Sequence, residues 1–254
     1  MRGQLGRDSV QGHHFLAVVS LSLALLTAGC GGAGGAGGSY RIVATTSVLP
    51  GRGTVVFTDD FHDRNSGWTT LTLPSGTRFT YGNRQYVVVA TGALHHYAYS
   101  PFEWPEQQLS AGVTATLSSG GALLSGFGIG CRRGSGGSEI RYELLVTGDG
   151  RWFVERGSGA PSTTTASTNL LKQGTAPVTP GATPLTLEGL CATLQDGHTT
   201  RLMLFVGGQQ VADMVDTADA LPDRGWVAEL VVLSSASANS TVIVTNFIER
   251  DAAH

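Results

Sequence analysis

Two glutamates, Glu139 and Glu143, are the first residues of this sequence that could do chemistry, because both fall on one face of a predicted strand. Hydrolysis of a glycosidic bond needs two carboxyl groups about 5 to 10 Å apart on facing positions. Residues four apart on a strand are separated by about 13 Å along it, which is too far for such a pair. Arg141 stands between them, and we expect it to pair with its neighbours on an exposed face. The sequence therefore predicts no catalytic pair here.

Residue types that bind metals are present, but their spacing is unfavourable. Asp59, Asp60 and Asp63 form an oxygen-rich run without the Asp-x-Asp-x-Asp-Gly pattern of a dedicated Ca²⁺ loop. We expect these carboxylates to bond to nearby backbone amides in a turn. His95 and His96 are adjacent, so on a strand their side chains point to opposite faces and cannot easily share one ion. We therefore expect no metal and no other cofactor.

Four aromatic side chains are candidates for binding a ligand. A sugar-binding face needs an aromatic platform and a few polar groups. Trp104 lies between two prolines in a predicted loop, where core packing does not readily explain a large aromatic residue, and it is the first candidate. Tyr97, Tyr99 and Trp152 are on predicted strands, where core or cross-strand packing is the alternative explanation.

The elements that would position these residues are predicted to be strands. From Thr54 onward, short apolar or alternating runs are bounded by Gly, Pro, Asn and Asp, which is typical of a sandwich of antiparallel strands. The turns Gly148-Asp149-Gly150 and Gly207-Gly208 have the residues of tight hairpins. In the strand 139–147, apolar residues alternate with charged ones, so we expect one face in the core and the other in water. The predicted strands are 55–57, 85–91, 93–100, 113–117, 123–132, 139–147, 151–155, 185–194, 200–206, 209–215, 225–233 and 241–249.

One segment interrupts the pattern of strands. Residues 157–184 are rich in Ser, Thr, Gly, Ala and Pro, which predicts a long surface loop. A loop of this length in a compact domain is either disordered or functional, and its composition favours disorder. O-linked sugar on the Ser and Thr residues is the functional alternative.

The amino end is predicted to be a secretory signal over residues 1–29. Arg2 and Arg7 precede an apolar run of about 12 residues, which is shorter than the roughly 20 needed to span a bilayer. Thr27-Ala28-Gly29-Cys30 resembles the lipobox of bacterial lipoproteins, in which the cysteine is diacylated, although Thr27 stands where most such boxes have Leu. Two acyl chains hold a protein stably on a membrane. We therefore expect lipidated Cys30, a Gly-rich linker over 30–53, and anchoring to the extracytoplasmic face of the cell membrane.

Lipidation of Cys30 would leave Cys131 and Cys191 as an even pair in an oxidising compartment. Neither has a Cys-x-x-Cys neighbour that would indicate a metal site. A bridge closing this loop would stabilise the fold by about 4 kcal/mol on the chain-entropy model. Two reduced, buried thiols are the alternative.

Several segments, in order along the chain, resemble a family of bacterial extracytoplasmic jelly rolls, the concanavalin A-like lectin/glucanase domains of the laminin-G-like and 3-keto-disaccharide-hydrolase-like kind. The segments are 59–68, 126–132, 142–144 followed by 148–150, 187–191, 204–209 and 244–247. The resemblance implies an all-β, concanavalin A-like sandwich of two antiparallel sheets over residues 54–250, with its two cysteine-bearing strands bridged. We expect Phe61 and Trp68 to plug one end of this sandwich. The Glu-x-Asp-x-x-Glu strand of related glucanases is not matched, because Arg141 replaces its central Asp.

The composition narrows the choice of partners. Charged residues make up 14% of the chain and its net charge is −3, so no basic patch indicates nucleic acid. We predict a lipid-anchored extracytoplasmic β-sandwich for non-catalytic recognition of cell-envelope carbohydrate or of an envelope partner. The alternatives are a glycoside hydrolase of the concanavalin A-like fold and a structural or partner-binding lipoprotein with no small ligand.

Overall fold

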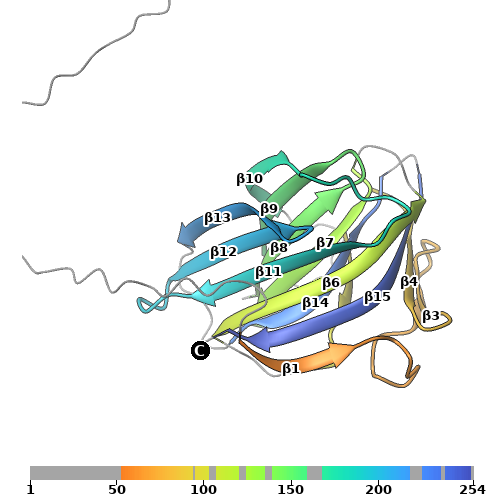
Figure 1. Cartoon of the computed structure of the whole chain (residues 1–254), viewed down its shortest axis with the longest axis horizontal. Helices are drawn as coiled ribbons and strands as arrows, with labels where there is room; N and C mark the ends of the chain where they lie inside the picture. The colour runs from red at the N-terminus through yellow and green to blue at the C-terminus, as the bar shows by residue number, and fades with distance from the viewer. Residues whose placement is uncertain are drawn as a thin grey trace, which may run out of the picture. The chain divides into compact units, whose positions relative to one another are not determined.

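A computed structural model describes residues 53–93, 95–102, 107–119, 124–134, 139–158, 168–217, 225–235 and 238–252. Every regular element in these ranges is a β-strand, and the strands form two antiparallel sheets (Figure 1). Within the same ranges, no helix has the length and apolar character needed to cross a membrane. The predicted all-β sandwich is confirmed, and each of the twelve predicted strands overlaps a strand of the structure.

The larger sheet has nine strands, in the order β13-β12-β11-β6-β15-β4-β3-β2, and β1 also pairs with β15. In Figure 1, β6, β11, β12, β13 and β15 cross the front of the domain. The strands of this sheet are β1 (Thr54–Asp59), β2 (Leu71–Thr72), β3 (Arg78–Tyr81), β4 (Tyr86–Ala90), β6 (Gln108–Ser119), β11 (Leu185–Thr193), β12 (Thr199–Val206), β13 (Gln209–Thr217) and β15 (Ser240–Asp251).

The smaller sheet has six strands, in the order β10-β9-β8-β7-β14-β5, and lies behind the larger one in Figure 1. Both predicted hairpins are confirmed: Gly150 (φ 80°) lies between β8 and β9, and Gly207 (φ 59°) and Gly208 (φ 80°) lie between β12 and β13. The strands of this sheet are β5 (His95–Tyr99), β7 (Gly126–Arg133), β8 (Ile140–Thr147), β9 (Arg151–Ser158), β10 (Thr168–Thr175) and β14 (Val227–Leu233).

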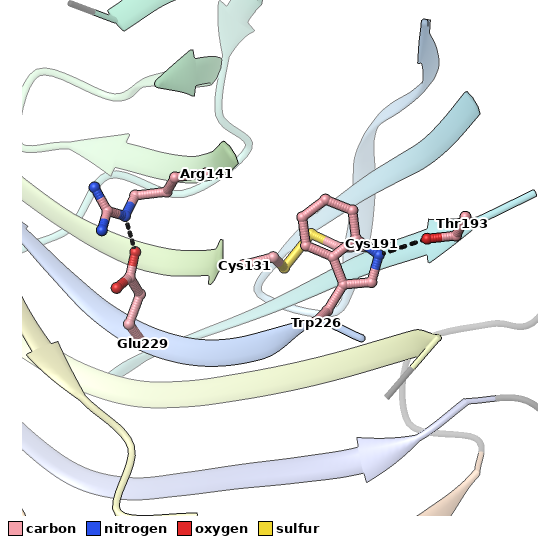
Figure 2. Close-up of a disulfide and its surroundings, with 6 residues drawn as sticks. All are labelled: Cys131, Arg141, Cys191, Thr193, Trp226 and Glu229. Carbon is pink, nitrogen blue, oxygen red and sulfur yellow. Dashed lines mark hydrogen bonds and ion pairs between the residues drawn. A yellow bond between two sulfur atoms is a disulfide. The ribbon is translucent and has the colours of Figure 1, made fainter. Parts of the chain in front are cut away.

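The two sheets pack through their apolar inner faces and are joined by a disulfide. Cys131 on β7 is bonded to Cys191 on β11, with a Cα–Cα distance of 6.3 Å, so the predicted bridge is confirmed. Trp226 packs beside it in Figure 2, where its indole nitrogen donates a hydrogen bond of 2.9 Å to the Thr193 hydroxyl. This bridge fixes β7 against the larger sheet, and β7 is the strand on which the site described below is centred.

A cluster of aromatic rings closes part of the core. The Phe61 and Trp68 rings are 5.6 Å apart, and Trp68 contacts Phe247 of β15 edge-on at 4.8 Å. Phe61 is fully buried and Trp68 is 3% exposed. Both residues are core, as their role as an apolar plug predicted.

The prediction of one long loop over residues 157–184 was wrong for part of that range. Residues 168–175 form β10, which pairs with β9 at the edge of the smaller sheet. All eight residues of β10 are exposed or partly exposed, Leu170 among them at 50%, so backbone hydrogen bonds hold the strand, together with Leu171, which packs against the core. An edge strand of this kind lacks the alternating apolar residues by which strands are recognised in a sequence. The short strands β2 and β3 were missed as well.

Candidate functional site

The outer face of the smaller sheet, which points away from the larger sheet, carries an unusual set of charged and aromatic side chains. On β8, Tyr142 and Leu144 belong to the core between the sheets, whereas Arg141 and Glu143 point to the opposite face. Neighbouring strands add side chains to the same face. The polar cluster, as we call this set, comprises His95, Tyr97, Tyr99, Arg132, Glu139, Arg141, Glu143, Glu155 and Glu229.

This outer face is concave, as its side-chain contacts show. His95 Nδ1 lies 2.5 Å from Glu143 Oε2, although β14 and β7 separate the strands that carry these residues. With neighbouring strands about 4.8 Å apart, β5 and β8 are about 14 Å apart across the sheet. The Tyr97 hydroxyl also donates a hydrogen bond of 2.8 Å to Glu143 Oε1. Side chains rooted this far apart can meet only if the sheet curves toward them.

In the middle of the concave face, β7 carries glycines at positions 126, 128 and 130, which present no side chain to this face. Gly130 lies between Glu143 on β8 and Glu229 on β14 in the strand register. A Cβ atom on Gly130 would lie 2.4 Å from Glu229 Cγ. Glycine at this position therefore provides the space that the Glu229 side chain occupies.

Arg141 is the centre of a buried ion-pair network. Its guanidinium donates to Glu139 Oε1 at 2.7 Å and to Glu229 Oε1, toward which Figure 2 shows it directed. The guanidinium also lies 4.1 Å from the centre of the Tyr97 ring. Only 1% of the Arg141 side chain is exposed, and Glu229 is fully buried. The predicted pairing of Arg141 is thus confirmed, but its predicted exposure is wrong, because the concave face brings side chains from β5 over it.

Glu143 and Glu155 are like charges placed directly opposite each other on β8 and β9. Burial raises the pKa of Glu155, and the charge of Glu143 adds to the rise. Burial alone would lower the pKa of His95, but its hydrogen bond to Glu143 and the charges of Glu143 and Glu155 raise it above the usual value. His95 and Glu155 therefore hold their protons more tightly than they would in water.

In the polar cluster, carboxyl groups outnumber the groups that can carry a positive charge. Burial raises the pKa of Glu229 to about 7, and Arg141 opposes the rise. Burial also raises the pKa of Tyr99 to about 12, so its hydroxyl stays neutral, and the Arg132 guanidinium lies 4.9 Å from the centre of this ring. In the cluster as a whole, four carboxyl groups face two guanidinium groups and His95.

The four aromatic residues predicted as ligand-binding candidates do not share one location in the fold. Tyr97 and Tyr99 are both partly buried on the concave face. Trp152 is 5% exposed and packs in the core between the sheets, as the alternative explanation predicted, although it also borders a cavity of about 340 Å³ beside the β12–β13 turn. Trp104 lies outside the described residues. A binding role for any of the four stays a prediction.

The structure also shows where the histidines and aspartates considered as metal ligands lie. His95 and His96 point to opposite faces, and His96 Nε2 lies 3.2 Å from the Thr91 carbonyl oxygen instead of facing the cluster. The three aspartates do form turns. Asp59, Asp60 and Asp63 each accept a hydrogen bond from the backbone N–H two residues later, at 2.7, 3.1 and 2.8 Å.

Three members of the cluster were missed from sequence, namely Arg132, Glu155 and Glu229. Glu229 is a single carboxylate with apolar residues on both sides in 227–233, and Glu155 follows the apolar run 152–154. The glycines at alternate positions of 126–130 were the second available sign, because they remove every side chain from one face of a strand.

The comparisons with known proteins identify a fold but no family. No protein-family model and no curated protein matches this chain. The carbohydrate recognition domain of Emp46p, in its potassium-bound form, has a TM-score of 0.51 and 11% identity, over 76% of this chain and 92% of that one. A galectin-like protein of unknown function from Bacillus subtilis has a TM-score of 0.54 and 9% identity, over 78% and 96%. A mutant of the GH43 protein BlXynB from Bacillus licheniformis has a TM-score of 0.50 and 14% identity, over 76% and 39%.

At these low identities the likeness concerns the fold alone. It confirms the predicted jelly roll of two antiparallel sheets, in its galectin-like and concanavalin A-like form. Solved structures with this fold include a carbohydrate recognition domain and a glycoside hydrolase-family protein.

Proposed function

We propose that this protein is a lipid-anchored, extracytoplasmic β-sandwich that binds carbohydrate on the concave face of its smaller sheet, without catalysis. The observation that carries the proposal is the polar cluster itself. Partly exposed polar and aromatic side chains, those of His95, Tyr97, Tyr99, Arg132 and Glu155, surround a buried network that fixes their positions. A rigid concave face with aromatic and polar groups is what a hydroxyl-rich ligand requires.

The cluster also has hydrogen-bonding capacity that the protein leaves unused. Arg132 Nε and Glu155 Oε2 are both buried atoms without a hydrogen-bond partner. One is a donor and the other an acceptor, so sugar hydroxyl groups, which both donate and accept, could satisfy the two. A buried polar atom left without a partner costs about 1 to 3 kcal/mol, and ligand binding would recover part of that cost.

The cellular location is part of the proposal. The lipobox-like residues 27–30 support a lipid anchor, and the bridge between Cys131 and Cys191 supports folding in an oxidising compartment. We propose cell-envelope glycan as the ligand class for that reason. Mass spectrometry of the processed chain tests the anchor, with a diacylated cysteine at position 30 as the expected amino end and an intact Met1 with a free thiol at Cys30 as the contrary result.

A glycan array and a pull-down on purified peptidoglycan test carbohydrate binding. The full chain is compared with Tyr99→Leu and Arg132→Gln in the cluster, and with Trp104→Ala. The matched control is Arg201→Gln, which removes an arginine paired with Asp213 on the larger sheet. We expect binding by the wild type and by the control, and loss of binding in both cluster variants. Absence of binding in both assays, or full binding by both cluster variants, would contradict the proposal.

A glycoside hydrolase is the second candidate, and one observation favours it. Possible ligand atoms of Glu143 and Glu155 lie within 4.8 Å of each other, near the separation of about 5 Å between the carboxyl groups of retaining enzymes. Against it, Glu143 is fully buried and could not reach a sugar as nucleophile without moving. Turnover of β-glucans or 3-keto-disaccharides that is abolished by Glu155→Gln would place hydrolysis first. Co-purification of one stoichiometric envelope protein, with no glycan bound, would instead favour a structural role.

A further inference from the structure

Three side chains of types that ligate metal ions converge in the polar cluster. They are His95 of β5, Glu143 of β8 and Glu155 of β9. One possible ligand atom from each, an imidazole nitrogen and two carboxylate oxygens, lies within 4.8 Å of the other two. Each residue stands on a hydrogen-bonded strand, so the three are held near one another by the sheet and not by a loop.

His95 is the only member of this trio that can carry a positive charge, against two carboxylates. Like charges directly opposite each other in an antiparallel pair are destabilising, and Glu143 and Glu155 are such a pair. Glu155 Oε2 is buried and has no hydrogen-bond partner. Glu229, which is fully buried and lies across Gly130 from Glu143, also has an oxygen without a partner, Oε2. A cation between Glu143 and Glu155 would relieve the repulsion and supply the partner that Glu155 Oε2 lacks.

We propose that His95, Glu143 and Glu155 bind a divalent first-row transition-metal ion, with Zn²⁺ as the best fit. One imidazole nitrogen with two carboxylate oxygens suits Zn²⁺, whereas Ca²⁺ and Mg²⁺ favour oxygen alone. Three protein ligands would leave one tetrahedral position open for water or for a hydroxyl of a bound ligand. The Tyr97 hydroxyl, which donates to the other oxygen of Glu143, would orient that carboxylate as an outer-shell partner.

Binding would require a small rearrangement and the loss of a proton. His95 Nδ1 and Glu143 Oε2, now 2.5 Å apart, share a hydrogen bond. Two ligand atoms of a tetrahedral Zn²⁺ site, each about 2.1 Å from the ion, lie about 3.4 Å apart, so the two side chains must separate by roughly 1 Å. The proton between them leaves as the ion enters. The His95 side chain is 26% exposed, which gives the ion a route from solvent.

This site goes beyond carbohydrate recognition and does not depend on it. It also differs from our expectation from the sequence, which was that the protein binds no metal. His95 was considered only with His96, which does point away, while its actual neighbours Glu143 and Glu155 come from distant strands. An ion held here would lie under the concave face between the partly exposed groups that we assign to sugar binding.

Metal titration of the full chain tests the proposal. The protein is stripped with EDTA and then titrated with Zn²⁺ in competition with a chromophoric chelator, with Mn²⁺ and Ca²⁺ in parallel. We expect one Zn²⁺ per chain and weaker binding of Ca²⁺. His95→Gln and Glu155→Gln should each lower the Zn²⁺ affinity at least about 10- to 100-fold. The matched controls, His198→Gln in an exposed turn and Glu188→Gln on β11, should bind Zn²⁺ like the wild type.

A second measurement avoids dependence on the folding of the variants. In the wild type, Zn²⁺ should shift the NMR resonances of the His95 ring and leave those of His198 unchanged. Absence of stoichiometric Zn²⁺ binding, or equal affinities in His95→Gln and the wild type, would overturn the proposal. Glycan binding measured with EDTA and with added Zn²⁺ separates the two hypotheses. If the chain binds glycan in both conditions but binds no Zn²⁺, carbohydrate binding is retained and the metal site is rejected.

Discussion

Both faces of the smaller sheet bury side chains, but the two buried sets differ in their chemistry. The inner face is apolar, with side chains such as Ile129 and Leu230 packed against the larger sheet. The outer face buries Arg141, Glu143 and Glu229. Apolar burial stabilises a fold by about 25 cal/mol per Å², whereas a buried ion pair often contributes no more than an apolar replacement would. The ion pairs of the outer face are therefore not explained by stability alone, and we propose that they serve binding.

The largest expected effect comes from breaking the outer network. Arg141→Met leaves the buried carboxylates of Glu139 and Glu229 without their guanidinium partner. We expect a loss of about 3 to 5 kcal/mol in the free energy of unfolding, measured by urea denaturation. Adding Glu229→Leu to this variant should restore part of the lost free energy of unfolding, since both partners of the Arg141–Glu229 pair are then apolar. If Arg141→Met costs less than 1 kcal/mol, the network is not as buried as the contacts indicate.

A nearly equal effect is expected from the inner face, where the disulfide joins the sheets. Replacing Cys131 and Cys191 together by alanine should lower the free energy of unfolding by about 4 kcal/mol, because the unfolded chain regains the freedom of a closed loop. Thermal or urea unfolding under non-reducing conditions measures the loss. Equal unfolding midpoints for the wild type and the double variant would contradict this.

The third prediction concerns Glu249, an inward-facing carboxyl that forms no ion pair with the residues that the structure describes. Burial raises the pKa of Glu249 to about 7, and Ser100 opposes the rise. The unfolded carboxyl loses its proton near pH 4.5, so between pH 4.5 and about 7 the folded state binds more protons and stability falls as pH rises. Glu249→Gln should remove this cost and make the protein more stable than wild type above pH 7, on the order of 3 kcal/mol.

The comparison of the two proteins across pH checks the sign of this effect. At pH 4 the wild type and Glu249→Gln should unfold at similar denaturant concentrations, because the wild-type carboxyl is then largely protonated in both states. A stability difference that is the same at pH 4 and pH 8 would show that Glu249 does not titrate as its burial implies.

The smallest effect is expected at an ion pair on the outer face of the larger sheet. Arg201 pairs with Asp213 through two hydrogen bonds of 3.0 and 2.7 Å, and both side chains are partly exposed. Arg201→Ala should change the free energy of unfolding by less than about 1 kcal/mol, since water replaces the lost contact. A loss comparable to that of Arg141→Met would remove the contrast between buried and exposed pairs.

The fold was largely predictable because alternation and turn residues are local properties of the chain. The strand 139–147 and the turns at 148–150 and 207–208 were found for that reason. The edge strand β10 was not, because its two leucines are adjacent rather than alternating and its pairing with β9 is not a local property of the sequence.

The site was predictable only in fragments. Alternation placed Glu139, Arg141 and Glu143 on one face correctly, but it could not show that this face is concave and therefore buried. The contact between His95 and Glu143 depends on strand order and sheet curvature, which no local pattern contains. Testing carboxylate pairs along one strand missed Glu155, whose partner lies across the hairpin.

The central claim, that carbohydrate binds the concave face of the smaller sheet, is tested most directly by NMR mapping. Soluble peptidoglycan fragments are titrated into the isotope-labelled chain, and the affected residues are assigned. We expect shifts at Tyr97, Tyr99, Arg132 and Glu155, with none at Arg201 on the larger sheet. Saturable shifts confined to the cavity beside Trp152, or no shifts at all, would contradict the account.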